Sequence, residues 1–260
     1  MQEIIEGDLY NYPKYYDLVF SSDWKAEHEF FLACFEKHAK CKVQRIFEPA
    51  CGTGRLLIKL AQSGFAVAGN DLNPHAIDFC NDRLERFGFP RSAVIGDMSD
   101  FKVRKKSEAA FNTINSFRHL PSEAAAESHL RCMAKGLKKG GLYLLGLHLS
   151  PTVGKPTETE SWSARRGHLV VNTHMWMIDR NKRKRNERLG IHFDIYTPTR
   201  QFRIIDTMDY RTYTSKQMRQ LLSRVPELEI AETYDFMYEL DHPVKITAET
   251  EDVVYVLRKK

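Results

Sequence analysis

Glycine and acidic residues stand at three points of the chain where an apolar run ends. The first is Phe47–Leu57, written FEPACGTGRLL, in which Gly52 and Gly54 separate a predicted strand from a predicted helix. Glycines let the backbone approach a ligand closely, and free N–H groups at a helix start favour an anionic group such as a carboxylate. The segment therefore predicts a ligand-binding turn at the edge of an α/β sheet, with a ligand-free glycine turn as the alternative.

The next two apolar runs end in acidic residues. Asp71 closes the second run, where a carboxylate can accept two hydrogen bonds from ribose hydroxyls. Asp97 follows the third run and could accept from an exocyclic amine, while Met98 could pack on an adenine face. A solvent-facing loop aspartate is the alternative for Asp97 alone. Together, the three strand ends favour one shared adenosyl-type ligand.

The segments EPACGTG (48–54), NDLNP (70–74) and GDM (96–98) resemble the successive cofactor motifs of class I S-adenosylmethionine-dependent methyltransferases. The spacing matches over about residues 43–149, although Ala50 replaces the first glycine of the usual motif. The resemblance implies S-adenosylmethionine as cofactor. Its expected contacts are Gly52 and Gly54 for the methionine part, Asp71 for the ribose, Asp97 and Met98 for the adenine, and Glu48 for the loop or the amino group. Tyr15, Ala50, Arg55, Leu72 and Asn115 complete the expected cofactor residues.

The end of the fourth predicted strand, NTINSFRHL (112–120), faces the methyl donor in this family. It lacks the Asn/Asp-Pro-Pro-aromatic motif used on base and amide nitrogens, and the chain has no Pro-Cys pair typical of cytosine-C5 chemistry. The run resembles small-molecule enzymes such as sugar N-methyltransferases, in which a Ser-x-x-His segment puts a histidine beside the acceptor. This resemblance makes His119 the catalytic candidate, because histidine suits a general base or an orienting role. Ser116, His119 and Trp176 are the expected substrate contacts, and a His119 that only caps a helix is the alternative.

The elements that must position these residues alternate along the chain. Hydrophobic periodicity predicts helices over about 23–39, 56–62, 73–87 and 123–137, and strands over about 43–49, 65–71, 93–96, 110–115 and 142–149. Lys138, Lys139 and Gly140-Gly141 look like the stop of the last of these helices. After Pro151 the runs 168–178, 189–196 and 201–206 alternate with period two, followed by a helix at 215–223 and strands at 228–236 and 253–257.

We therefore expect a Rossmann-like, doubly wound, mostly parallel seven-stranded α/β sheet with an antiparallel β insertion after the fifth strand. The expected division is an N-terminal helical cap at 1–40, the cofactor domain at 41–149 and 211–260, and the insertion at 150–210. Tyr10, Tyr12, Tyr15 and Tyr16 would lie in the cap, where the resembling enzymes fold a segment over the cofactor. The charged stretch from Arg180 to Arg185 is interpreted as a solvated hairpin end.

Composition excludes some other classes. No apolar run approaches the roughly 20 residues that span a bilayer, and the acidic start lacks the pattern of a secretory signal, so we expect a cytoplasmic protein. The five cysteines form no C-x-x-C pair or metal cluster, so no metal is expected. A net charge of +5 does not by itself imply a nucleic-acid partner.

The sequence predicts a methyltransferase that acts on an amine or hydroxyl of a small molecule. A methyltransferase acting on RNA or protein and a non-catalytic S-adenosylmethionine-binding protein stay as alternatives. A dinucleotide oxidoreductase is disfavoured, because its fingerprint needs a small residue where this chain has Leu57.

Overall fold

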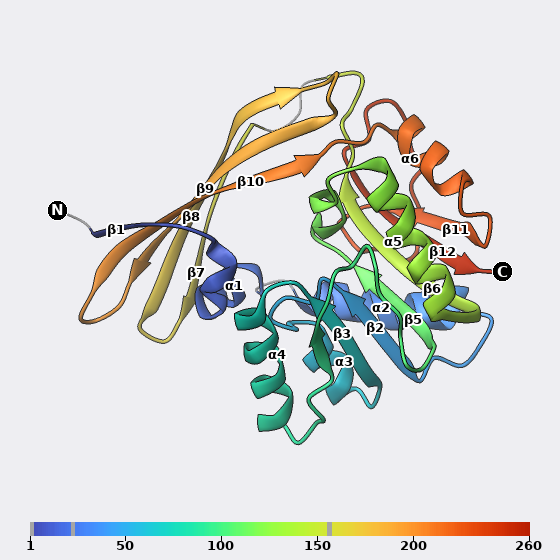
Figure 1. Cartoon of the computed structure of the whole chain (residues 1–260), viewed down its shortest axis with the longest axis horizontal. Coiled ribbons are helices and arrows are strands. Elements are labelled where there is room, and N and C mark those ends of the chain that lie inside the picture. The colour runs from blue at the N-terminus through green and yellow to red at the C-terminus, as the bar shows by residue number, and fades with distance from the viewer. Residues whose placement is uncertain (1–2, 22–23, 155–157) are drawn as a thin grey trace.

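Two β-sheets dominate the computed structural model, which describes residues 3–21, 24–154 and 158–260 (Figure 1). Sheet B has seven strands in the order β11-β12-β6-β5-β2-β3-β4, and sheet A has five in the order β1-β10-β9-β8-β7. The strands of sheet B are β2 (Arg45–Pro49), β3 (Ala66–Asp71), β4 (Ala93–Ile95), β5 (Ser107–Asn112), β6 (Leu137–His148), β11 (Leu228–Tyr234) and β12 (Asp252–Lys259). Those of sheet A are β1 (Glu3–Glu6), β7 (Thr159–Arg166), β8 (Leu169–Asn181), β9 (Asn186–Tyr196) and β10 (Gln201–Arg211).

Sheet B has the expected Rossmann-like arrangement. Strands β2 to β6 pair in parallel, whereas β12 pairs antiparallel with β6, and β11 antiparallel with β12. The chain adds β3 and β4 on one side of β2 and then crosses to the other side of β2 to form β5 and β6. A crevice forms at such a switch point beyond the carboxyl ends of the strands. The predicted α/β class and seven-stranded sheet are confirmed.

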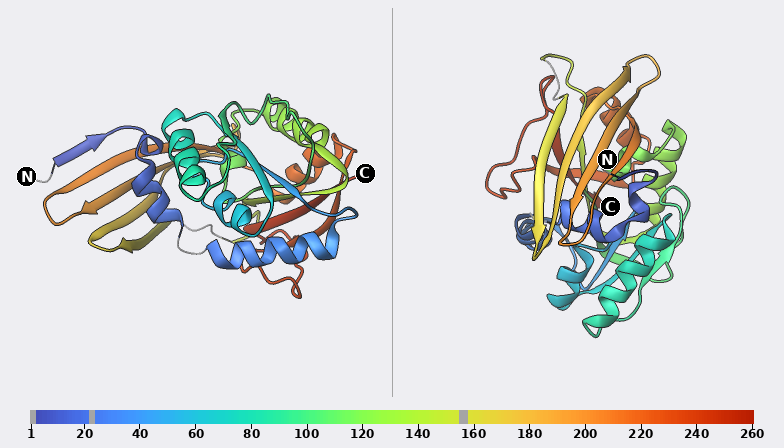
Figure 2. Two further views of the ribbon diagram at one scale, coloured as in Figure 1. Left: turned by 90° about the horizontal axis from the view of Figure 1, so that it is seen from below. Right: turned by 90° about the vertical axis from the view of Figure 1, so that its left-hand side faces the viewer.

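Helices cover both faces of sheet B. One face is packed by α2 (Trp24–His38), α3 (Leu57–Gln62) and α4 (Pro74–Arg86), and the other by α5 (Glu123–Gly136) and α6 (Ser215–Ser223). Figure 2 shows α2 and α5 on opposite sides of the sheet. The predicted helix at 23–39 corresponds to α2, although residue 23 lies outside the described residues.

Local sequence explains where the helices begin. Asn73 caps α4 by accepting a hydrogen bond from the backbone N–H of Ala76, and Pro74 occupies the first turn. Thr214 and Gln217 form a capping box at α6, with both reciprocal bonds present. These caps lie where the sequence predicts helix starts.

Several predicted strand boundaries are wrong; β10, for example, extends to Arg211 instead of residue 206. Helix α5 ends at Gly136, within one residue of the prediction, but β6 begins at Leu137 instead of residue 142. Gly141 lets β6 run so close to β5 that a Cβ there would lie 2.6 Å from the carbonyl oxygen of Glu108. Strand β5 ends at Asn112 instead of residue 115, because Ile114 and Asn115 have φ angles of 56° and 66°. A left-handed backbone cannot continue a strand.

Sheet A forms the β insertion after the fifth strand, as the sequence predicts. The three predicted runs are β8, β9 and β10, which pair antiparallel; β7 extends them on one side. The sequence analysis missed β1, which pairs in parallel with β10 on the other side. Next come a 3-10 turn, η1 (Leu9–Asn11), and helix α1 (Pro13–Phe20), which pack on the apolar side of sheet A.

The two sheets are joined by buried ion pairs. Asp17 of α1 is 1% exposed and accepts from Thr53 Oγ1 at 3.0 Å, Arg83 Nη2 at 2.5 Å and Arg166 Nη2 at 3.2 Å. Burial acts to raise the pKa of Asp17, but hydrogen bonds from Arg83, Ser21 and Arg166 outweigh it and hold this pKa below its usual value. Asp17 therefore connects the cap to the glycine turn, to α4 and to sheet A.

The predicted solvated hairpin end also makes such pairs. Arg180 and Arg118 both bind Glu187, and Arg118 and Glu187 are almost completely buried. Arg185 Nη1 lies 2.7 Å from Glu123 Oε2 at the start of α5. The β8–β9 hairpin is therefore held against the larger domain through Arg180 and Arg185.

None of the helices within residues 3–21, 24–154 and 158–260 combines the length and the hydropathy of a membrane-spanning segment.

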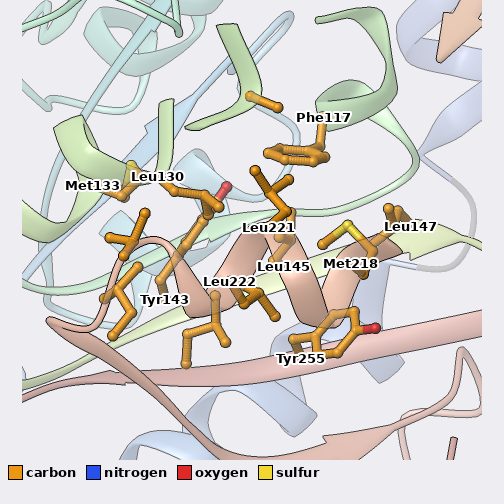
Figure 3. Close-up of a cluster of buried hydrophobic side chains, with 14 of the residues drawn as sticks. Phe117, Leu130, Met133, Tyr143, Leu145, Leu147, Met218, Leu221, Leu222 and Tyr255 are labelled. Carbon is orange, nitrogen blue, oxygen red and sulfur yellow. The ribbon is translucent and has the colours of Figure 1, made fainter. Parts of the chain in front are cut away.

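A buried histidine crosses the core between sheet B and α5. His129 has no exposed surface; its Nδ1 lies 2.8 Å from the carbonyl oxygen of Met98, and its Nε2 lies 2.7 Å from the hydroxyl of Tyr143. Figure 3 shows Tyr143 among the surrounding apolar side chains, including Leu130 and Leu145. The imidazole therefore holds the Met98 loop against the core.

We expect this histidine to make folding sensitive to acid. Burial lowers the pKa of His129 to about 4. Between that value and the ordinary value near 6.5, the unfolded chain binds a proton that the folded chain does not, so stability falls as the pH is lowered. One such proton contributes a slope of about 1.4 kcal/mol per pH unit. Urea unfolding from pH 7 to pH 4.5 should show a shallower loss of stability for His129→Gln than for wild type.

The exposed His242 provides the control for this measurement. It lies on the surface beside Glu239, so His242→Gln should keep the wild-type dependence on pH. Equal slopes for His129→Gln and wild type would contradict the prediction.

Candidate active site and cofactor pocket

A cavity of about 1010 Å³ lies between the carboxyl edge of sheet B and sheet A. Its sheet B side includes Gly52, Asp71 and Met98 from three successive loops. The remaining walls include residues of η1, α1 and strands β7 to β10, together with the adjacent ends of β6 and β12. The three segments selected from the sequence therefore converge on one space.

The glycine turn shows why small residues are needed. Ala50, Gly52 and Gly54 have φ angles of 52°, 51° and 66°, the left-handed region that favours glycine. A Cβ on Gly54 would lie 2.3 Å from Cys80 Sγ, so Gly54 allows α4 to pack closely and does not itself line the cavity. Ala50 and Gly52 do line it. Ala50 thus adopts a left-handed backbone conformation that glycine adopts more easily.

Asp71 stabilises the glycine turn from the end of β3. Its Oδ2 accepts from the backbone N–H of Gly52 at 2.8 Å, and its Oδ1 accepts from that of Asn73 at 2.9 Å. Burial raises the pKa of Asp71, while these backbone bonds act in the opposite direction. The carboxylate faces the cavity together with the neighbouring Leu72, which is 67% exposed.

Glu48 lies at the end of β2, where the glycine turn begins, but is not among the residues that line the cavity. It is 8% exposed, and among the described residues its Oε2 has no hydrogen-bond partner. Burial raises its pKa well above the usual value, against the attraction of Arg55. Arg55 itself does not line the cavity; it pairs with Glu27 at 2.7 Å, and Glu27 does. The turn therefore contains an acceptor that a cationic ligand group would satisfy.

The loop after β4 brings only part of its predicted residues to the cavity. Met98 lines the cavity and is 8% exposed. Asp97 lies on the surface, where Oδ1 accepts from the backbone N–H and the hydroxyl of Ser99 at 2.6 and 2.8 Å. Its carboxylate shapes this loop.

The loop after β5 places the three predicted residues Asn115, Ser116 and His119 on the cavity wall. Asn115 has left-handed φ, and its Oδ1 accepts from the backbone N–H of His148 at 2.7 Å. Left-handed backbone in residues other than glycine is strained and persists where surrounding contacts enforce it. Asn115 therefore joins the ends of β5 and β6.

His119 is partly buried at the cavity wall. Its Nε2 lies 2.9 Å from the hydroxyl of Tyr10, and its ring packs against Tyr210 with 4.6 Å between ring centres. Burial, helped by the charge of Arg118, lowers the pKa of His119 to about 4. At neutral pH the ring can therefore donate or accept a hydrogen bond, but it binds a proton weakly.

Among the N-terminal tyrosines, the cavity is lined by Tyr10 and Tyr16. Tyr15, which the sequence analysis selected, packs against Phe202 of sheet A and does not line it. The helical spacing of Tyr16 and Phe20, both on the cavity wall, could have identified the correct face of α1.

Trp176, the predicted substrate contact of the insertion, lies on the cavity wall. Gly190 on the neighbouring strand makes room for this indole, since a Cβ there would lie 2.3 Å from its ring. The sequence analysis missed other wall residues. Those used below are Arg118, His148, Glu187, Tyr210 and Asp252.

Acidic side chains outnumber basic ones on the cavity wall. The acidic ones are Asp8, Glu27, Asp71, Glu158, Glu160, Glu187, Glu251 and Asp252, and the basic ones are Arg118 and Arg180. Both arginines pair with Glu187. In the described part of the chain, no group of histidine, cysteine and acidic residues has the arrangement of a metal site.

Comparison with known proteins agrees with this geometry. A family model described as "Methyltransferase domain" matches residues 46–141. The chain is 26% identical over 102 residues to the S-adenosyl-L-methionine-dependent Diels-Alderase iccD of Talaromyces variabilis, which covers 39% of this chain and 35% of that protein. For a second curated relative, the matched part is 57% of its length. The match thus spans about a third to just over half of these curated relatives.

Solved structures match over almost the whole chain. An S-adenosylmethionine-dependent methyltransferase from Clostridium acetobutylicum is similar with a TM-score of 0.78 and 16% identity, covering 97% of this chain and 99% of that one. An amino pentose methyltransferase from Micromonospora echinaspora is similar with a TM-score of 0.71 and 18% identity, covering 94% and 95%. Residues 46–141 thus match the model of a methyltransferase domain, and the chain shares the fold of solved S-adenosylmethionine-dependent methyltransferases.

Proposed function

We propose that this protein transfers the methyl group of S-adenosylmethionine to an amine or hydroxyl of a small molecule. The observation that carries the proposal is the convergence of Gly52, Asp71 and Met98 with Asn115 and His119 on one cavity walled by sheet A. Similarity to an amino pentose methyltransferase supports a small acceptor. The cytoplasmic location expected from the sequence stays part of this proposal.

The residues of the glycine turn and the two following loops fit the cofactor. We assign Ala50 and Gly52 to its methionine part, with Gly54 and Arg55 shaping the turn. The buried, unpartnered Oε2 of Glu48 suits an ammonium group, and charge-assisted hydrogen bonds of this kind are the strong ones. Asp71 and Leu72 are assigned to the ribose and Met98 to the adenine, with Asp97 holding the adenine loop.

When bound, S-adenosylmethionine supplies a methyl carbon activated by a positively charged sulfur. The protein then has to align the acceptor and exclude water. Sheet A and the cap provide the enclosure, through Trp176 on one side and Tyr10 and Tyr16 on the other. Asn115 and Ser116 lie at the end of β5, where an acceptor would approach.

His119 is assigned an orienting role. With a pKa of about 4, the ring is neutral at physiological pH and a weak proton acceptor. Its bond to Tyr10 fixes the ring, so the pair can hold one polar group of the acceptor in place. Since a misplaced acceptor reacts slowly, orientation by such contacts contributes to the rate.

An RNA acceptor is less compatible with the cavity. Nucleic-acid sites gain most of their affinity from lysine and arginine near phosphates. Here the wall is mainly acidic, and both of its arginines already pair with Glu187. This charge distribution favours a small acceptor that is neutral or cationic.

The similarity to iccD is relevant to the alternative that the protein binds S-adenosylmethionine without transferring its methyl group. The name of that protein couples S-adenosylmethionine to a Diels-Alder reaction. Cofactor binding alone would therefore not establish the proposed activity, and the test has to detect a methylated product.

The assigned cofactor site predicts an effect on affinity. Removal of a charged hydrogen-bonding partner costs about 1.5–3 kcal/mol, so Asp71→Ala should weaken S-adenosylmethionine binding at least about tenfold. Isothermal titration calorimetry measures this directly. Asp82→Asn, which changes an exposed carboxylate on α4, should bind like wild type. An unchanged affinity of Asp71→Ala would count against the ribose assignment.

The assigned acceptor site predicts an effect on turnover. His119→Ala should lower kcat by about 100-fold, because the acceptor loses its orienting contact. Tyr10→Phe, which removes one hydrogen bond, should lower it by about tenfold. Tyr15→Phe is the matched control outside the cavity. If His119→Ala turns over like wild type, His119 has no part in the reaction.

The function itself is tested with matched pairs of acceptors. Small sugars that carry an amine, such as glucosamine, are incubated with S-adenosylmethionine beside the corresponding hydroxyl compounds, such as glucose. The expected result is release of S-adenosylhomocysteine together with an acceptor heavier by one methyl group, detected by mass spectrometry. Tight binding of S-adenosylmethionine with no methylated product from small molecules, but with methylation of RNA or protein, would overturn the proposal.

A further inference from the structure

A histidine–carboxylate pair lies on the same cavity wall. His148 is the last residue of β6 and Asp252 the first of β12, and the two face each other across the antiparallel strands. His148 Nδ1 lies 2.6 Å from Asp252 Oδ1. Both side chains line the cavity and keep 35% and 45% of their surface exposed. The pair is therefore within reach of a bound molecule.

The pair lies at the acceptor end of the cavity. In sheet B, β6 and β5 lie on one side of β2, whereas β3 and β4, which lead into Asp71 and Met98, lie on the other. The residues assigned to the adenosine are thus separated from His148 by the glycine turn. The backbone N–H of His148 donates to Asn115 Oδ1, so His148 adjoins the loop assigned to the acceptor.

The geometry leaves one ring nitrogen available. A carboxylate beside Nδ1 favours the tautomer that carries the proton there, which leaves a lone pair on Nε2. Nε2 of His148 makes no hydrogen bond to any described residue. The ring of Phe236 packs edge-on against the imidazole, with 5.1 Å between the ring centres. His148 is thus oriented like a base with its carboxylate partner.

His119 is less suited to the same task. Its Nε2 is already bonded to the Tyr10 hydroxyl, and burial lowers its pKa to about 4. His148 has a carboxylate partner and remains partly exposed. Of the two histidines, His148 is the one placed to take up a proton.

The charges around the pair indicate which acceptor loses that proton. Charged or titratable groups lie on the surrounding walls. They include Glu251 beside Asp252, Arg118 and His119 on η2 (Ser116–His119), Glu158 just before β7, and Glu160, Arg180 and Glu187 on sheet A. Since both arginines pair with Glu187, the surplus is negative. A negative wall attracts an ammonium group and repels an anionic acceptor.

We propose that His148, oriented by Asp252, is the base that deprotonates the ammonium group of an amine acceptor before methyl transfer. The inference rests on the proposed function. One proton moves from the acceptor nitrogen to His148 Nε2. The freed lone pair forms the bond to the methyl carbon as the bond from that carbon to the cofactor sulfur breaks, and the imidazolium then releases its proton to solvent.

The tautomer is tested by nitrogen NMR of the histidine side chains, which needs no acceptor. At pH 8 the signal lost in His148→Gln should report a protonated Nδ1 and a bare Nε2. In Asp252→Asn this preference should be reduced, since the carboxylate that holds the Nδ1 proton is gone. A proton on Nε2 in the wild-type protein would overturn the proposal.

The role in the reaction is tested by steady-state kinetics with glucosamine or another amine that the acceptor panel shows to be methylated. His148→Gln should lower kcat by about 100-fold or more, the usual contribution of a general base. Asp252→Asn should lower kcat by about tenfold with little change in the KM for S-adenosylmethionine. The control is His242→Gln, which alters an exposed histidine–glutamate pair and should leave the kinetics unchanged.

Binding of S-adenosylmethionine separates this inference from the proposed function. His148→Gln should bind the cofactor with wild-type affinity in calorimetry. If the wild-type protein binds S-adenosylmethionine and methylates an amine, but His148→Gln does so at the same rate, the base assignment alone is wrong. If His148→Gln loses cofactor binding, His148 acts on the cofactor site and the assignment is wrong as well. If the wild-type protein neither binds nor methylates, the proposed function fails first.

Discussion

The buried carboxylate of Asp17 is the contact on which the cavity most depends. It accepts hydrogen bonds from Thr53 in the glycine turn, Arg83 in α4 and Arg166 in sheet A. A carboxylate with almost no solvent exposure destabilises the fold unless it is paired. Separating Asp17 from these partners would therefore strongly reduce the stability of the protein. Asp17, a single residue of the cap, thereby fixes the distance between the glycine turn and the β insertion. The enclosure of the cavity follows from this constraint.

Backbone strain is concentrated where the cavity meets sheet B. Ala50, Ile114 and Asn115 all have left-handed φ angles without being glycine. Asn115 is held by its bond to the backbone of His148, and the turn around Ala50 by the carboxylate of Asp71. Such conformations persist only where neighbours enforce them, and they aim the loops after β2 and β5 into the cavity. The rigid sheet behind them provides that support.

Two histidines of the cavity differ because their surroundings differ. His119 is surrounded by aromatic rings and lies next to Arg118, so it stays neutral and serves as a hydrogen-bonding group. His148 lies at a strand end beside Asp252 and retains contact with the cavity space. In the proposed reaction the same type of side chain therefore has two roles: His119 orients the acceptor and His148 takes its proton. The burial of each histidine and the groups beside it decide which of these two roles it can have.

The sequence by itself determined the alternation of strands and helices, the β insertion and the three loops that meet at the cavity, because these depend on local periodicity and on glycine and acidic residues at strand ends. It selected Asp71, Met98 and His119, which all line the cavity. Only the tertiary structure decided that Tyr10 and Tyr16 face the cavity instead of Tyr15, that β1 joins sheet A, and that Asp97 turns to Ser99. It alone paired His148 with Asp252, more than a hundred residues apart in the chain. Such pairings arise from strand order and packing between distant segments, for which a local pattern carries no signal.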